Sequence, residues 1–260
     1  MNANSVQSLF SMAGRVALVT GSTRGLGFAI ATALGEAGAQ VVITSEDADA
    51  VPTAVEALQS RTIDARGHCC DVTDEDGQAA LVERIGGEHG RLDALVCNTG
   101  VGGKAGRFYD IGIQDFDLVI GTNLRAATQL AQLCHPLLAN SRDASVILIS
   151  SIAGVRGNAM INNYALAKAA LAQLARNLAV QWGPDNIRAN AIAPGLIATE
   201  LWTRLTDDQD FMQRRLGMTP LRRVGQTHEI GAVTLLLASR ASGFLRSADR
   251  GRQRHHDHRW

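Results

Sequence analysis

The residues best suited to acid–base chemistry are Tyr164 and Lys168, together with Ser151 thirteen residues before the tyrosine. Residues 163–171 are strong helix formers without a breaker, so a spacing of four places Tyr164 and Lys168 on one helix face. An ammonium beside a phenol favours the phenolate and lowers the phenol pKa from about 10. A hydroxyl such as Ser151 can then hold a substrate oxygen while Tyr164 gives or takes a proton. An ordinary exposed helical pair would show the same spacing.

A glycine-rich loop supplies the context that favours chemistry. Gly21, Gly25 and Gly27 follow an apolar run at residues 15–20 and precede a helical stretch at 28–37. Free backbone N–H groups and the positive end of a helix dipole favour a pyrophosphate at such a place, and glycine lets it approach closely. Many tight turns also carry two or three glycines, so the triplet alone is weak. Its position between a strand and a helix favours nucleotide binding.

Short apolar runs alternate with helical stretches along the chain. Strands are predicted at 15–20, 41–44, 65–70, 92–96, 145–149 and 187–192, and helices at 28–37, 51–59, 78–85, 116–139 and 163–182. This alternation predicts an α/β fold, a Rossmann-like doubly wound parallel sheet with helices on both faces. No linker or repeat divides residues 1–244, so we expect one domain there.

Composition excludes several classes of function. Only 19% of the 260 residues are charged and the formal net charge is zero, so no nucleic-acid partner is expected. No apolar run is long enough to cross a membrane, and residues 1–12 lack the features of a secretory signal. Four irregularly spaced cysteines fit neither a disulfide framework nor a metal site, and the scattered histidines are not expected to be ligands. We therefore expect a cytoplasmic protein without a bound metal.

Over residues 13–244 the chain resembles the short-chain dehydrogenase/reductase family in five motifs that occur in the family's order. They are the loop Thr20-Gly21-x-x-x-Gly25-x-Gly27, the pair Asp71-Val72, the segment Cys97-Asn98-Thr99-Gly100, the set Asn123, Ser151, Tyr164 and Lys168, and Pro194-Gly195-x-x-x-Thr199. In the third motif the family usually has Asn-Asn-Ala-Gly, so Cys97 and Thr99 depart from it. The remaining motifs match.

The resemblance implies hydride transfer between a nicotinamide and a secondary alcohol or ketone, which is the expected small-molecule substrate. Tyr164 would be the acid or base, Ser151 would bind the substrate oxygen, and Lys168 would lower the Tyr164 pKa and bind the ribose. Asn123 would hold a water that links Lys168 to solvent. The cofactor-binding residues implied are Gly21, Ser22, Thr23, Arg24, Gly25, Leu26, Gly27, Ser45, Glu46, Asp71, Val72, Asn98, Thr99, Gly100, Tyr164, Lys168, Pro194, Gly195, Ile197 and Thr199.

The sequence leaves the choice between NAD and NADP nearly balanced. NAD-specific relatives carry an acid at the end of the second strand, where this chain has Ser45. Arg24 could pair with a 2′-phosphate, whereas Glu46 would repel it or bind the ribose hydroxyls. We expect a slight preference for NADP. Residues 201–221, with Trp202, Leu205, Phe211 and Met212, fall where relatives have a mobile lid, although a helix packed on the core would look the same.

The C-terminus departs from the family, whose members continue with a last strand and an Asp-Gly-Gly-type ending. Residues 245–260 are polar and basic without apolar alternation, so we expect that strand to be missing or altered. They could be a solvated tail or an arm that binds nucleic acid or metal. A third hypothesis is a frameshift near Phe244, because codons can be chosen whose shifted frame reads CGQQIVVDSGTTITDG, a family-like ending. A rival function follows, a dinucleotide-binding sensor or scaffold with impaired catalysis. In relatives the helices at 116–139 and 163–182 form the interface of a homodimer, commonly within a homotetramer.

Overall fold

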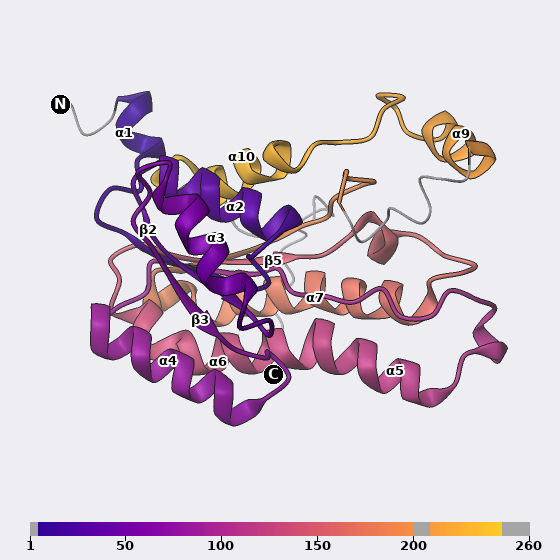
Figure 1. Cartoon of the computed structure of the whole chain (residues 1–260), viewed down its shortest axis with the longest axis horizontal. Coiled ribbons are helices and arrows are strands. Elements are labelled where there is room, and N and C mark those ends of the chain that lie inside the picture. Colours follow the sequence, from indigo (N-terminus) through magenta and orange to yellow (C-terminus); the bar gives the residue numbers. More distant parts are fainter. Residues whose placement is uncertain (1–4, 200–208, 246–260) are drawn as a thin grey trace, which may run out of the picture.

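The computed structural model describes residues 5–199 and 209–245, and its centre is a six-stranded parallel sheet (Figure 1). The strand order is β3-β2-β1-β4-β5-β6. The strands are β1 Val16–Val19, β2 Gln40–Ser45, β3 Ala65–Cys69, β4 Ala94–Cys97, β5 Ala144–Ile149 and β6 Ile187–Ile192. All neighbouring pairs run parallel, as the alternation of strands and helices predicts. The predicted strands are confirmed to within two residues at each end.

Helices cover both faces of the sheet. On one face α2 (Gly25–Glu36), α3 (Ala50–Gln59) and α10 (Thr227–Ala238) pack against side chains such as Val19 and Ile43. On the other, α4 (Glu75–His89), α6 (Ala126–Ala139) and α7 (Asn162–Gln181) pack against Leu18 and Leu95. The central strands β1, β4 and β5 are buried at every position, because a parallel sheet covered on both faces leaves no polar side. The continuous apolar runs of these strands are the sequence signal of that burial.

The remaining helical elements are short. They are α1 (Val6–Phe10), α5 (Ile113–Ile120), α9 (Gln209–Gly217) and the 3₁₀ turns η1 (Phe108–Asp110), η3 (Ile152–Val155), η4 (Gly183–Asp185) and η6 (Arg240–Ser242). Among residues 5–199 and 209–245, no helix is long and apolar enough to span a bilayer.

The predicted α-helix over residues 116–139 is wrong in its middle. A π-helical segment, η2 (Gly121–Arg125), joins α5 to α6. Asn123 lies in this segment, and both ends of its side-chain amide bond to the backbone of Val101: Oδ1 accepts from the Val101 N–H at 2.7 Å and Nδ2 donates to the Val101 carbonyl at 2.9 Å. Such π segments are local widenings that often occur at functional sites, and the periodicity of the sequence does not reveal them.

The sheet ends at β6 within the described part of the chain. Arg188 of β6 is almost fully buried, and its guanidinium donates to the Leu237 carbonyl and the Ser242 hydroxyl, each at 2.7 Å, and to Asp143 at 3.2 Å. Burial lowers the Arg188 pKa, and the Asp143 carboxylate opposes that shift. The bonds to Leu237 and Ser242 tie the end of α10 and the turn after it to β6. Residues 246–260 lie outside the described residues, so the hypotheses about the tail stay predictions.

Candidate active site

The first half of the site lies where β1 and β4 end, at the point where the strand order reverses. Parallel α/β sheets bind ligands in this crevice, outside the carboxyl ends of the strands. Thr20, directly after β1, accepts from the N–H groups of Asn98 and Thr99 at 3.0 and 3.1 Å, and the Asn98 amide donates to the Thr20 and Gly21 carbonyls at 3.0 Å each. These bonds hold the two loops side by side.

The glycines of the first loop have different reasons to be glycine. Gly21 and Gly25 have φ angles of +58° and +56°, which disfavour a side chain. A Cβ on Gly27 would collide with the Gly21 carbonyl, and a Cβ on Gly21 would lie 2.8 Å from the Thr99 hydroxyl. At Gly21 and Gly27 the backbone therefore lies too close to its neighbours to carry a side chain, and this leaves a cradle of backbone atoms at the start of α2. The Thr99 Oγ1 is itself buried without a hydrogen-bond partner in the described structure.

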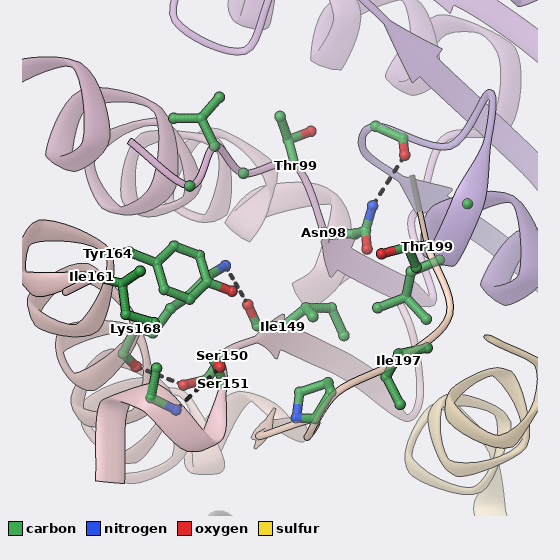
Figure 2. A pocket seen from close by; sticks show the side chains of 18 of the residues that line it. Asn98, Thr99, Ile149, Ser150, Ser151, Ile161, Tyr164, Lys168, Ile197 and Thr199 are labelled. Atoms are coloured by element: carbon green, nitrogen blue, oxygen red, sulfur yellow. Dashed lines mark hydrogen bonds between the residues drawn. The ribbon is translucent and has the colours of Figure 1, made fainter. Parts of the chain in front are cut away.

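One large cavity, of about 950 Å³, begins at this loop and extends to Tyr164 and Lys168 (Figure 2). Its size suits a dinucleotide together with a small substrate. The predicted site residues that line it are Gly21, Thr23, Arg24, Gly25, Leu26, Gly27, Ser45, Glu46, Val72, Asn98, Thr99, Gly100, Ser151, Tyr164, Lys168, Pro194, Gly195, Ile197 and Thr199. The fold thus brings residues from five separate motifs around a single space.

Three residues of the predicted site do not line this cavity. Ser22 is fully buried, donates to the Val19 carbonyl at 2.6 Å and accepts from the Thr44 N–H at 3.0 Å, so it connects the ends of two strands. Asp71 is exposed, and its carboxylate accepts from the backbone and hydroxyl of Thr73 at 2.8 Å each. The third is Asn123, whose amide bonds to Val101. For Ser22 and Asp71 these contacts are structural.

Ser151 and Tyr164 meet in the wall of the cavity. Ser151 caps η3, where its hydroxyl accepts from the Ala153 N–H at 3.1 Å. Tyr164 is in the first turn of α7 with 7% of its surface exposed, and its phenol is hydrogen-bonded to the Ser151 side chain. Figure 2 shows both side chains on one side of the cavity, with Asn98 and Thr99 on the other. Two hydroxyls that share a hydrogen bond can together hold one substrate oxygen.

Lys168 lies one helical turn further and is buried behind Tyr164. Its ammonium donates to the Ile149 carbonyl at 2.8 Å and is 5.5 Å from the centroid of the Tyr164 ring (Figure 2). The Ser150 hydroxyl donates to the Lys168 carbonyl at 2.6 Å, which fixes this turn of α7 against the end of β5. Burial disfavours the charged form and lowers the Lys168 pKa to about 8.

The expected lowering of the Tyr164 pKa is wrong for this structure. Burial raises the pKa of the phenol, and the hydrogen bond with Ser151 opposes that shift without overcoming it. The Lys168 ammonium, which was expected to lower this pKa, donates its hydrogen bond to the Ile149 carbonyl. The spacing correctly predicted that Tyr164 and Lys168 share a helix face. It contains no information on burial, which disfavours the charged form of both side chains.

Sequence reasoning missed Gly154 and Ser150, two residues that hold η3 and the end of β5 against α7 beside Lys168. A Cβ on Gly154 would lie 2.6 Å from the Ala169 nitrogen, so only glycine lets η3 pack directly on α7 beside Lys168. Gly154 belongs to the Ser-Ile-Ala-Gly stretch after β5, and its position there was the available signal. No pattern marks Ser150, whose role depends on the packing of β5 against α7.

The far part of the cavity is lined by the segment after Pro194 and by α9. Met212 lies on α9 and is partly buried, whereas Trp202 and Leu205 of the predicted lid lie outside the described residues. A loop with Arg156 and Asn158 forms another part of this wall, together with Arg215 of α9. The sequence analysis did not single out these three residues. In residues 5–199 and 209–245 no three His, Cys, Asp or Glu side chains are grouped so as to hold a metal ion.

Comparisons with known proteins agree with this geometry. A family described as Enoyl-(Acyl carrier protein) reductase matches residues 21–249. A tropinone reductase homolog of Arabidopsis thaliana is 34% identical over 237 residues, which are 91% of this chain and 88% of the relative. A gluconate 5-dehydrogenase from Burkholderia cenocepacia, solved with NADP and tartrate, superimposes with a TM-score of 0.89 at 29% identity and covers 94% of this chain and 95% of its own.

A 7α-hydroxysteroid dehydrogenase, solved with NADH and 7-oxo glycochenodeoxycholic acid, superimposes with a TM-score of 0.86 at 33% identity and covers 92% of each chain. The structural likeness extends over the sheet and the helices on both faces, and the sequence match includes the cavity. Together with the glycine loop and the Ser151, Tyr164 and Lys168 cluster, these matches show that the chain belongs to the short-chain dehydrogenase/reductase family.

Proposed function

We propose that this protein interconverts a secondary alcohol and a ketone with a nicotinamide dinucleotide. The observation that supports this most directly is the hydrogen-bonded pair of Ser151 and Tyr164 in the wall of a cavity that also contains the glycine loop. The cradle at Gly21 and Gly27 and the unpaired buried hydroxyl of Thr99 suit a closely approaching polar ligand. When bound, NAD(P)H supplies the hydride. The residues proposed to hold it are those of the glycine loop, Asn98 to Gly100, Lys168 and Pro194 to Thr199.

The protein's own residues supply the proton and the orientation. In reduction, the Ser151 hydroxyl donates a hydrogen bond to the substrate carbonyl oxygen, and the Tyr164 phenol transfers its proton to that oxygen. Because burial raises the Tyr164 pKa, the phenol carries this proton at neutral pH, which suits an acid better than a base. Lys168 contributes positive charge behind the Tyr164 ring. Asn123 holds the backbone of Val101, and the preceding residue, Gly100, lies beside the Lys168 ammonium. A water path from Lys168 along Asn123 stays a prediction.

The test is a panel of ketones and secondary alcohols followed by nicotinamide absorbance with each cofactor. We expect turnover of some members and a higher kcat/KM with NADP(H), because Arg24, Ser45 and Glu46 line the same end of the cavity and Ser45 leaves space for a 2′-phosphate. The gluconate 5-dehydrogenase solved with NADP supports this choice, and the hydroxysteroid dehydrogenase solved with NADH supports the other. Absence of turnover with both cofactors would exclude the proposal.

Ketone reduction is expected to decline above about pH 8. The Lys168 ammonium is present below its pKa of about 8 and is lost above it, and Tyr164 keeps its proton throughout because its pKa is raised. We therefore expect kcat/KM to be level between about pH 6 and 7, to reach about half its maximum near pH 8, and to fall about tenfold per pH unit above about pH 9. The measurement is a pH profile of kcat/KM at saturating cofactor. A profile that stays level to pH 10 would show that reduction does not need the Lys168 proton.

The edge of the sheet at β6 favours the second candidate function, a dinucleotide-binding sensor or scaffold. Strand β6 is an edge of the sheet within the described residues, and an unpaired edge can weaken a fold or its assembly. A dinucleotide-binding sensor or scaffold would bind NAD(P)H without turning over any member of the panel. The contacts among Ser151, Tyr164 and Lys168 favour the enzyme, because a binding protein has no need of them.

We further propose a homodimer or homotetramer that uses the face of α5, α6 and α7, where Leu118, Leu166 and Val180 are exposed by 49–79%.

The four cysteines, Cys69, Cys70, Cys97 and Cys134, are free thiols, which fits a reducing compartment such as the cytoplasm.

A further inference from the structure

Two arginines line the substrate side of the cavity, and the proposed chemistry uses neither of them. Arg156 follows η3 and is exposed, and Arg215 lies on α9 and is partly buried. They are close enough for the Arg156 charge to act on Arg215: burial lowers the Arg215 pKa, and the Arg156 charge lowers it further. The loop after η3 and helix α9 thus bring two positive charges to one wall of the cavity. A negatively charged group between them would relieve their repulsion.

The described residues hold no such partner. In residues 5–199 and 209–245 neither guanidinium forms an ion pair or donates a hydrogen bond. Among the cavity-lining residues that the structure describes, Glu46 is the only one with a carboxylate, and it lies with Ser45 and Arg24 at the adenosine end. The other arginine and lysine of the lining are accounted for, since Arg24 belongs to the glycine loop and Lys168 bonds to Ile149. Within residues 5–199 and 209–245, therefore, no carboxylate balances the positive charge at this wall.

The loop that carries Arg156 is held in place. The Asn158 amide donates to the Ala153 and Arg156 carbonyls at 2.7 and 2.9 Å, and the Met160 carbonyl accepts from the Gly106 N–H at 2.8 Å. Just after α9, the Thr219 hydroxyl donates to the carbonyl of Arg215 on that helix at 2.9 Å. The rest of this wall is largely apolar, with Ile152, Met160 and Leu196. A ligand that fits has an apolar body and one charged end.

Resting on the proposed function, we propose that the substrate is an anionic ketone or alcohol whose oxyanion group is bound by Arg156 and Arg215. Guanidinium groups bind carboxylate and phosphate through paired hydrogen bonds, and two of them near each other favour a full negative charge over a neutral dipole. Lysine would supply charge without that planar match. The reacting carbonyl would lie at Ser151 and Tyr164, with the anionic group toward the cavity wall formed by the Arg156 loop and α9.

The test uses ketones that are identical except for one terminal group, with methylene spacers of increasing length. The terminal group is a carboxylate, a phosphate or a neutral methyl ester. We expect the best anionic ketone to exceed its ester at least about tenfold in kcat/KM, and Arg156→Gln and Arg215→Gln each to remove about tenfold of the anionic rate only. The preference should weaken with added salt, because Arg156 is exposed. The carboxylate and phosphate series show which oxyanion is preferred.

Arg214→Gln is the matched control, because Arg214 is exposed on the same helix and does not line the cavity. It should leave the preference unchanged, and NADPH affinity should stay unchanged in every variant. Esters that match the anions, or variants that slow both classes equally, would overturn the proposal while the oxidoreductase function stands. If no ketone is reduced, the oxidoreductase function fails, and the arginine proposal is tested separately by calorimetric binding of the same carboxylates. Loss of binding in the variant that carries both Arg156→Gln and Arg215→Gln supports the proposal. Binding equal to that of the wild type overturns it.

Discussion

Tyr164→Phe is expected to lower kcat/KM for ketone reduction by about 10²- to 10⁴-fold while NADPH binds nearly as tightly as to the wild type. The change removes only the phenol oxygen, which is hydrogen-bonded to the Ser151 side chain and faces the cavity. The ring stays and continues to fill its buried place between α7 and η3. The measurement combines steady-state kinetics with titration of NADPH fluorescence, which separates proton transfer from cofactor binding.

The chain offers a matched control, because its only other tyrosine is Tyr109. Tyr109 is 75% exposed, and its hydroxyl accepts from Arg107 at 2.6 Å, outside the cavity. Tyr109→Phe removes the same atom at the surface and should leave kcat/KM unchanged. If Tyr164→Phe kept the activity of Tyr109→Phe, the phenol would not be the proton donor, and a different group or a water would have to replace it.

The sheet could be predicted because its signal is local. Residues such as Val16–Val19 and Ala144–Ile149 form continuous apolar runs, and a strand buried on both faces requires nothing else. The glycine loop was equally accessible, since Gly21 and Gly25 adopt the positive φ angles that a side chain disfavours. The grouping of Ser151, Tyr164 and Lys168 followed from a helical spacing and a family resemblance.

What escaped prediction depends on distances between elements far apart in sequence. The π segment at Gly121–Arg125 is tied to Val101 through Asn123, more than twenty residues away. Ser22 has the position of a cofactor contact in the loop, yet its side chain turns inward to join β1 and β2. The direction of the Tyr164 pKa shift depends on how deeply the phenol is buried, which outweighs its hydrogen bond with Ser151. Sequence spacing contains none of these quantities.

The second large effect is expected at Gly154, which does not line the cavity. Gly154 is not among the glycines with positive φ, so its backbone tolerates a side chain, and only space excludes one. A Cβ would lie 2.6 Å from the Ala169 nitrogen, 2.7 Å from the Lys168 carbonyl carbon and 3.0 Å from the Ala169 Cα. These are backbone atoms inside α7 and cannot rotate away, so η3 must move instead. Because Ser151 caps η3, its hydroxyl moves relative to the Tyr164 phenol.

Gly154→Ala should therefore lower kcat/KM by about 10²-fold, since a shift of about 1 Å at a catalytic group has such an effect. It should also lower the free energy of unfolding by about 1–3 kcal/mol through overpacking. Gly157→Ala is the control in the same loop: a Cβ there meets nothing within 4 Å, and replacing glycine at a compatible site is neutral or stabilises by about 0.4–1 kcal/mol. Urea unfolding and ketone reduction measure both effects. Equal stability and activity of the two variants would show that η3 does not need close packing on α7 to align Ser151 with Tyr164.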